Sequence, residues 1–226
     1  PGAIVRLIQY NEDPTKTDLF VVTHVHIDHF NDISSIIESS REVLHDKDYN
    51  YYKKGTLITT SDSLTLISDY HLSMIENIIK FNAGDKYIYN NTEIIGTKVK
   101  HSQTEGFGIR FNLKNYSLAF TSDTMVFDDF SEQFSGVNIL ILNLLRPDSI
   151  SCRRHLSTDE VIPYLNNINP NLDALIVTHF GSYMDGPRST KNLVPSQVKK
   201  IQDNTNITNV IGAEDGLKIK INQLLK

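Results

Sequence analysis

Apolar runs separated by polar turns predict most of the secondary structure of this chain. Short apolar runs of the kind typical of buried strands fall at residues 3–9, 18–23, 56–60, 87–89, 93–100, 107–111, 116–120, 137–142, 173–178, 209–212 and 217–221. Apolar residues at helical spacing predict helices at about 31–40, 61–67, 70–79, 126–134, 157–166 and 195–204. This order favours a largely antiparallel run of strands followed by a βαβ alternation, and hence two sheets flanked by helices rather than a doubly wound nucleotide-binding fold.

Local signals sharpen several of these elements. Asn90-Asn91 predicts a hairpin turn, and Asp215-Gly216 predicts a second one between the last two runs. Ser157 or Thr158 can cap the helix that follows, with Glu160 completing a capping box. The polar segment 41–54 reads as a loop over the entrance of a site. Two histidines stay ambiguous, since His45 is expected on the surface and His71 either lines a pocket or is structural.

Composition and charge narrow the class of protein. A length of 226 residues fits one domain, 1–226, with 39% hydrophobic and 22% charged residues. The net charge of −5 argues against non-specific coating of nucleic acid. No apolar run is long enough to span a bilayer and no signal peptide is recognisable, so we expect a cytoplasmic protein without a membrane partner. Cys152 is the single cysteine, which excludes an intramolecular disulfide and a thiolate-rich zinc site.

A dense group of metal-competent side chains follows the run at 18–23. His24, His26, Asp28 and His29 lie within six residues, between this strand and the next helical pattern. On an extended backbone His24 and His26 point the same way, and Asp28 continues that alternation. Imidazoles with one carboxylate suit zinc or a similar divalent ion.

Three further candidate ligands repeat this placement, each just after an apolar run: His101, Asp123 and His179. Five of the eight histidines therefore follow predicted strands. Strand ends are where α/β sheets usually carry their chemistry. The sequence thus predicts a metal centre assembled from several strand ends.

This pattern of His-x-His-x-Asp-His followed by single His, Asp and His resembles the metallo-β-lactamase superfamily over nearly the whole chain. The resemblance implies a four-layer αββα sandwich, with Pro1-Gly2 as the end of a glycine-rich turn and the first strands missing from the sequence. It also implies two ligand sets. His24, His26 and His101 would hold one ion, and Asp28, His29 and His179 the other, with Asp123 bridging them.

The resemblance further implies a dinuclear hydrolase with two divalent ions, by default zinc, though manganese or iron occurs in similar sites. A hydroxide shared by the ions would attack a phosphodiester; the alternative is a thioester or lactone hydrolase using the same site. Cys152 does not fall at the position of the cysteine ligand in the common antibiotic hydrolases, so antibiotic hydrolysis is not expected. Asp28 and His29, with Asp123 as the bridge, resemble instead the phosphodiesterase, thioester hydrolase and lactonase branches. A di-iron redox protein would need a flavin domain that the sequence lacks, and a non-enzymatic scaffold is disfavoured because every ligand position is filled.

His155-Leu156-Ser157-Thr158 is similar to the His-Ser-Thr element of the ribonuclease Z-like, tRNA 3′-processing branch, although Leu156 is inserted. Asn143 stands where that branch places a glutamate. We therefore interpret Asp28 and His155 as catalytic residues, with a capping role as the alternative for His155. Arg146, Arg153 and Arg154 are either anion-binding or solvated. The expected partners are a small-molecule or nucleic-acid phosphodiester and a second copy of the chain in a homodimer.

Overall fold

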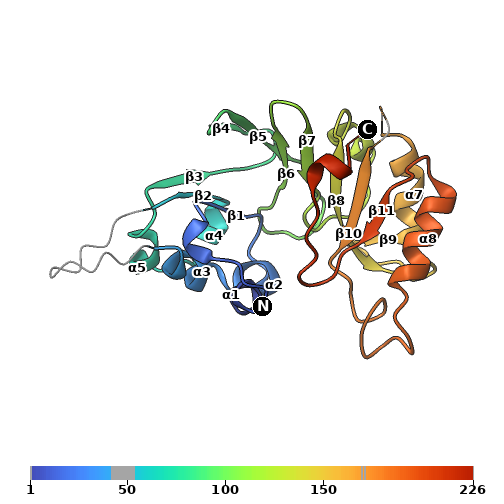
Figure 1. The fold of residues 1–226 in the computed structure, drawn as a ribbon, viewed down its shortest axis with the longest axis horizontal. Helices are drawn as coiled ribbons and strands as arrows, with labels where there is room; N and C mark the ends of the chain where they lie inside the picture. Colours follow the sequence, from blue (N-terminus) through green and yellow to red (C-terminus); the bar gives the residue numbers. More distant parts are fainter. Residues whose placement is uncertain (1, 42–53, 169, 171, 226) are drawn as a thin grey trace. The chain divides into compact units, whose positions relative to one another are not determined.

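The computed structural model describes residues 2–41, 54–168, 170 and 172–225 (Figure 1). The chain divides into two compact units, which are described one at a time. Unit 1 comprises residues 1–82 and 103–106, and unit 2 comprises residues 83–102 and 107–226. The loop expected at 41–54 falls, with His45, almost entirely outside the described residues.

Unit 1 is built on a parallel three-stranded sheet in the order β1-β2-β3. Its strands are β1 (Leu19–Val22), β2 (Thr56–Thr59) and β3 (Asn77–Lys80). Short helices join them: α2 (Ile27–Phe30), α3 (Ile33–Ser39), α4 (Ser61–Leu64) and α5 (Asp69–Leu72). Apolar side chains of the strands and helices meet in one core, which includes Phe20, Val22, Ile37, Leu57 and Ile67.

The first apolar run was wrongly predicted as a strand, because residues 3–9 form helix α1 (Ala3–Gln9). Such a short run fits both periods, and here no residue of the helix is buried. The Asp32 carboxylate accepts hydrogen bonds from the backbone N–H groups of Gly2 and Ala3, at 2.6 and 3.1 Å. It thereby satisfies donors that a helix start leaves without an intrahelical partner. A 3₁₀ turn, η1 (Pro14–Lys16), follows.

The helix expected over 70–79 is also wrong beyond its first turn. Helix α5 stops at Leu72, and Asn77–Lys80 pairs in parallel with β2, placing Ile78 opposite Leu57. Backbone pairing with a buried strand therefore outweighs the helical spacing of the apolar residues. The cap of α4 is Thr60, whose hydroxyl accepts a hydrogen bond from the Ser63 N–H. The first strands of the chain were expected to pair antiparallel, and this prediction is also wrong, because β1, β2 and β3 are parallel.

Unit 2 contains an eight-stranded mixed sheet in the order β11-β10-β8-β7-β6-β5-β4, with β9 paired to β8 (Figure 1). Its antiparallel half is formed by β4 (Lys86–Tyr89), β5 (Thr92–Thr97), β6 (Gly108–Asn112) and β7 (Ser117–Phe120). Its parallel half is formed by β8 (Ile139–Arg146), β9 (Leu156–Ser157), β10 (Ala174–Thr178) and β11 (Val210–Gly212). The predicted hairpin at Asn90-Asn91 is confirmed, with φ values of 45° and 64°.

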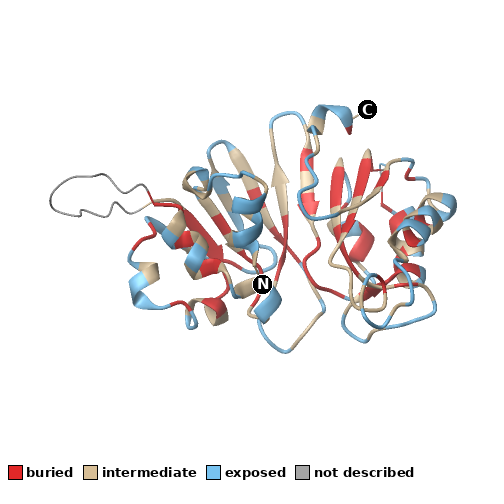
Figure 2. Ribbon diagram, turned by 60° about the horizontal axis from the view of Figure 1, so that its bottom comes forward, coloured by how far each residue is buried: buried red, intermediate tan, exposed pale blue. Residues whose placement is uncertain are grey.

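Helices α6 (Phe130–Gln133), α7 (Thr158–Asn166) and α8 (Val194–Asn204) cover one face of this sheet. The alternation along β8 explains the arrangement, because Leu140, Leu142 and Leu144 belong to the core that includes the helices. Ile139, an odd-numbered residue of β8, belongs instead to a second cluster, on the opposite face of the sheet. Figure 2 shows buried residues concentrated in the strands next to the helices and exposed residues on the outer sides of α7 and α8, and β8 has the longest buried stretch of the sheet.

The hairpin expected at the C-terminus does not form. Strand β11 pairs in parallel with β10, and residues 217–220 adopt no regular structure before the 3₁₀ turn η2 (Ile221–Gln223). Helix α8 is the crossover that carries the chain from β10 to a parallel neighbour, as right-handed βαβ units require. The apolar residues after β11 still bury surface, since Leu224 packs against the cluster containing Ile139 and Ala174. Within the described residues, no helix has the length and apolarity needed to cross a bilayer.

Candidate functional site

In unit 2, the strands β5, β7, β8 and β10 run in the same direction and end at the same edge of the sheet. β5 and β7 are both antiparallel to β6, and β7, β8 and β10 are mutually parallel. Parallel strands present their carboxyl ends together. His101 follows β5, Asp123 follows β7, Asn143 lies toward the end of β8 and His179 directly follows β10. The predicted ligands His101, Asp123 and His179 therefore lie at one edge of the sheet in this unit, as expected from their positions after strands.

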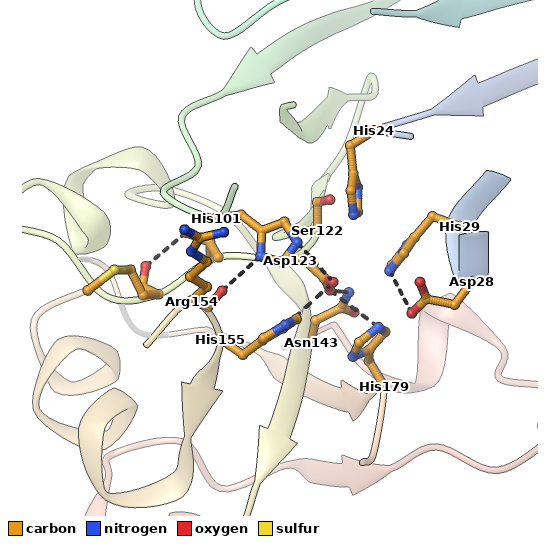
Figure 3. Close-up of polar contacts among 12 residues, drawn as sticks. His24, Asp28, His29, His101, Ser122, Asp123, Asn143, Arg154, His155 and His179 are labelled. Carbon is orange, nitrogen blue, oxygen red and sulfur yellow. Dashed lines mark hydrogen bonds and ion pairs between the residues drawn. The ribbon is translucent and has the colours of Figure 1, made fainter. Parts of the chain in front are cut away.

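The Asp123 carboxylate is the centre of the group in unit 2, with only 2% of the residue exposed. Three imidazoles surround it, as the dashed lines in Figure 3 show. Its Oδ2 lies 3.7 Å from His101 Nε2 and 3.6 Å from His155 Nδ1, while its Oδ1 lies 3.4 Å from His179 Nε2. The two carboxylate oxygens thus face different histidines.

These separations fit the donor set of a metal ion. Nitrogen and oxygen ligands bind zinc at about 2.0–2.2 Å, so two of them at a tetrahedral angle lie about 3.4 Å apart. The distances from Asp123 to His101 and His179 are close to that value and longer than ordinary hydrogen bonds. Buried carboxylate and imidazole donors together are a chemistry that suits zinc and similar divalent ions.

The tautomer of His101 is fixed by the backbone. Its Nδ1 lies 2.9 Å from the carbonyl oxygen of Arg154. Because a carbonyl only accepts, Nδ1 must carry the proton and donate it. In the neutral ring, the lone pair then sits on Nε2, the atom that faces Asp123. This backbone contact is the type of outer interaction that orients a metal-ligating histidine.

Asn143 holds the same carboxylate from β8. Its Nδ2 donates a hydrogen bond of 2.8 Å to Asp123 Oδ1, and the side chain is buried. Its Oδ1 accepts no hydrogen bond from the part of the chain that the structure describes. An amide can donate to an ionised carboxylate without competing for its charge, so Asn143 orients Asp123 where a glutamate would repel it.

Strained backbone accompanies both strand ends. Ser122 and His179 have φ values of 56° and 63°, in the left-handed region that residues other than glycine seldom adopt. The turn after β10 takes its positive φ at His179 and not at Gly181. Gly181 is needed for close approach, since a Cβ there would lie 2.7 Å from the Leu145 carbonyl oxygen.

The second group lies in unit 1, where the chain leaves β1. The ring of His24 is buried and lies 4.8 Å from that of His26 and 4.3 Å from that of His29, centroid to centroid. His29 Nε2 is 3.4 Å from Asp28 Oδ2. The Thr23 hydroxyl contacts His24 Nδ1 at 3.1 Å. Three imidazoles and a carboxylate, the donors predicted from the motif, are therefore gathered within this unit.

The predicted side-chain alternation holds only in part. His24 precedes the helix and His26 is its N-cap with extended φ and ψ, whereas Asp28 already belongs to helix α2. Asp28 therefore reaches the group from the first helical turn rather than from the strand, and so does His29. Ile27–Phe30 forms a separate short helix that precedes α3.

Other sequence candidates have ordinary surroundings. His71 contacts the Ser68 hydroxyl at 2.8 Å and Glu38 at 3.7 Å, which favours the structural alternative. Ser157 is the N-cap of α7 as predicted, but its hydroxyl bonds to the Glu160 side chain instead of a backbone N–H. The carbonyl of Arg154 and the hydroxyl of Thr23 were missed, because backbone acceptors and neighbouring hydroxyls leave no recognisable sequence pattern.

The fold and these two groups define the class of protein. A family model described as a β-lactamase superfamily domain matches residues 6–180, and the chain belongs to this superfamily. An uncharacterised protein of Methanocaldococcus jannaschii is 30% identical over 222 residues, covering 98% of this chain and 80% of that protein. Membership supports a metal-dependent hydrolase that binds divalent metal through histidine and aspartate.

Solved structures agree on the fold. The metallo-β-lactamase fold protein YhfI of Bacillus subtilis superposes with a TM-score of 0.74 at 15% identity, covering 96% of this chain and 82% of its own. A diphosphatase of the PhnP family gives 0.70 at 18% identity, with coverages of 97% and 77%. The human short-form tRNase Z gives 0.67 at 14%, with 97% and 85%. The predicted α/β metallo-β-lactamase fold class is therefore confirmed.

Proposed function

We propose that this chain is a phosphodiesterase that uses two divalent metal ions, zinc by default, in a site of the ribonuclease Z-like type. The observation that carries the proposal is the buried Asp123 carboxylate with three histidine nitrogens 3.4–3.7 Å from its two oxygens. A hydrolase needs such a carboxylate to be ionised and held in place, and Asn143 donates to it.

The ligand assignment proposed from the motif remains the following. His24, His26 and His101 would hold one ion, Asp28, His29 and His179 the second, and Asp123 would bridge the two. The two faces of Asp123 support the bridging role, because Oδ2 is turned to His101 and Oδ1 to His179. When bound, two such ions lower the pKa of water to near neutrality and offset charge that develops on an attacked oxygen.

The residues of the chain would carry the remaining steps. His101 keeps its proton on Nδ1 through the Arg154 carbonyl, so its Nε2 stays available as a ligand. His155 has 21% of its side chain exposed, against 5% for His101, so water and substrate reach it more easily. We propose that His155 holds a proton and donates it to the oxygen of the leaving alcohol.

The choice of a phosphodiester as substrate rests on the His155-Leu156-Ser157-Thr158 element and on the activities named for two similar structures. Two of the similar structures are named as a diphosphatase and a tRNase Z. A carbonyl substrate, such as a thioester or lactone, would use the same ligands, and the thiolate of a thioester leaves without needing a proton from an acid. We keep that reaction as the alternative outcome of the substrate test.

The test compares turnover of the zinc-loaded protein on bis(4-nitrophenyl) phosphate, an aryl thioester and a lactone. Hydrolysis of the diester well above the other two is the expected result, and preference for the thioester or lactone would replace the proposal. On dithymidine monophosphate, whose leaving alkoxide needs a proton, His155→Ala should lower turnover about a hundredfold or more, as loss of a general acid does, while metal content stays at the wild-type level.

His71→Ala is the matched control, since this histidine contacts Ser68 and Glu38 in unit 1, and turnover should not change. If His155→Ala retains turnover, His155 has no catalytic role. If it loses metal together with turnover, His155 is a ligand instead of an acid.

The use of the two units as one hydrolase domain, 1–226, is part of the proposal. A cytoplasmic location and a homodimer stay predictions from the sequence.

A further inference from the structure

A cavity of about 680 Å³ borders the group in unit 2 and is lined by positive side chains. Its described lining residues are Val99, Lys100, His101, Ser102, Met125, Arg153 and Arg154. Three of them are cationic and none of those described is acidic, in a protein whose net charge is −5. The local field is therefore opposite in sign to that of the whole chain, which favours an anionic ligand.

The three cations lack a close ionic partner within the described part of the chain. Among the described residues, no salt bridge involves Lys100, Arg153 or Arg154, whereas nearby Lys98 pairs with Asp129 at 3.0 Å. The Lys100 ammonium lies 5.7 Å from the centre of the Phe127 ring and interacts with the Asp129 carboxylate without forming a salt bridge to it. Solvated arginines would be the ordinary alternative, but here they share one cavity with a lysine.

The wall of the cavity is tied to the candidate site within the same unit. The Arg154 carbonyl accepts from His101 Nδ1, and the Lys100 N–H donates to the Thr124 hydroxyl at 2.9 Å, next to Asp123. The Met125 N–H in turn donates to the Lys100 carbonyl at 2.8 Å. These contacts hold the backbone of Lys100 and Arg154 next to Asp123 and His101, which anchors the base of both cationic side chains at the cavity wall.

The size and the lining indicate what the cavity would hold. Pockets for small molecules measure about 300–1,000 Å³, so this one exceeds the needs of a single phosphate. Val99 and Met125 add apolar wall next to the three cations. Arginine guanidinium groups match phosphate oxygens through paired hydrogen bonds.

We infer that this cavity is a subsite for a second, uncleaved phosphate of the substrate, carried on a nucleotide-sized group next to the scissile phosphodiester. The inference rests on the proposed function for the identity of the scissile bond. Lys100, Arg153 and Arg154 bind the uncleaved phosphate, and they thereby select substrates with two neighbouring phosphates over simple diesters.

The kinetic test uses the zinc-loaded protein and dithymidine monophosphate, with or without an added phosphate at its 5′ or 3′ end. One of the two phosphorylated forms should have a KM at least about tenfold lower than that of dithymidine monophosphate itself. This is the size of effect expected from hydrogen bonds to a charged group. The double variant Arg153→Gln/Arg154→Gln should lose this preference. Arg6→Gln, the same change at an exposed arginine of α1, should keep it.

A binding test separates this inference from the proposed activity. Inorganic phosphate is titrated into the metal-free protein and followed by calorimetry. We expect saturable binding to the wild type and to Arg6→Gln, and about tenfold weaker binding to the double variant. Absence of phosphate binding in the wild type, or equal binding by the double variant, overturns the subsite.

The two failures are distinguishable. Hydrolysis of all dithymidine substrates with the same KM would refute the subsite and leave the phosphodiesterase in place. Phosphate binding that depends on Arg153 and Arg154, without hydrolysis of any diester, would refute the proposed function and leave an anion site.

Discussion

At the scale of single residues, the orientation of Asp123 depends on a neutral neighbour. Asn143 Nδ2 donates a hydrogen bond of 2.8 Å to Asp123 Oδ1, and both side chains are buried. A buried carboxylate keeps its charge only if donors or cations surround it. Asn143 supplies one such donor without adding a charge, which leaves the carboxylate available to ions.

Asn143→Leu should weaken metal binding about 10- to 100-fold, the range found when a partner that orients a ligand is removed. The measurement is competition for zinc with a chelator of known affinity. Asn112→Leu is a matched control, because Asn112 Nδ2 donates 2.8 Å to the Glu93 carboxylate away from these ligands. Equal zinc affinity in the Asn143 variant and the wild type would show that Asp123 needs no such support.

At the scale of elements, α8 is joined to its surroundings by a charged contact. Lys200 Nζ lies 2.8 Å from Asp148, in the loop after β8, and 2.5 Å from Asp159, in α7. Hydrogen bonding from Lys200 lowers the pKa of Asp148, and hydrogen bonds to Asp148 and Asp159 raise the pKa of Lys200. Both shifts stabilise the ionised pair in the folded state.

The pH range of this contribution follows from the directions of the shifts. The Asp148 contribution is present above the ordinary aspartate pKa of about 3.9 and is lost as pH falls through the lowered folded pKa. The Lys200 contribution is present below the ordinary lysine pKa of about 10.4 and is lost as pH rises through the raised folded pKa. Lys200→Met should therefore lower the Tm by a few degrees at neutral pH.

The Tm difference between wild type and Lys200→Met should shrink in acid below pH about 4 and in base above pH about 10. Lys199→Met serves as the control, because Lys199 pairs only one turn along α8, with Asp203. A Tm difference that is the same at every pH would mean that Lys200 contributes through packing of its apolar stem.

The elements also show how far the sequence alone could go. The runs that became β1, β2, β4 to β8, β10 and β11 were predicted because apolar residues cluster between polar turns, and the ligands were found because they follow such runs. Strand β9 was not predicted, because its two residues are too few to form a pattern. Residues 3–9 and 74–79 were misassigned, since their apolar spacing fits two structures and the outcome depends on Asp32 and on β2. The Asn143 and Arg154 contacts to Asp123 and His101 depend on tertiary placement that no local pattern encodes.

At the scale of the whole molecule, metal binding should be visible as stability. An ion that binds only the folded state at 100 times its Kd stabilises by about 2.7 kcal/mol. For a chain of about this length, 1 kcal/mol corresponds to about 2–4 °C in Tm, so zinc should raise the Tm by about 5–10 °C.

Chelation should reverse this increase, and Asp123→Asn should reduce it sharply while the metal-free variant still melts cooperatively. Asp129→Asn changes an exposed carboxylate that pairs with Lys98 and should leave the zinc effect intact. The same zinc-induced increase in Asp123→Asn and in the wild type would exclude Asp123 as a ligand.

The change from antiparallel to parallel pairing at β7 in unit 2 has a consequence for how the chain acquires its structure. Short turns join β4 to β5 and β6 to β7, and residues 98–107 link β5 to β6, whereas β8, β10 and β11 meet only after longer crossovers. Contacts between residues close in sequence form faster than distant ones. The meander therefore orders first and places Asp123 at its free edge, and His179 arrives only when β10 docks. In refolding, amide protection around residues 108–120 should precede protection around residues 174–178.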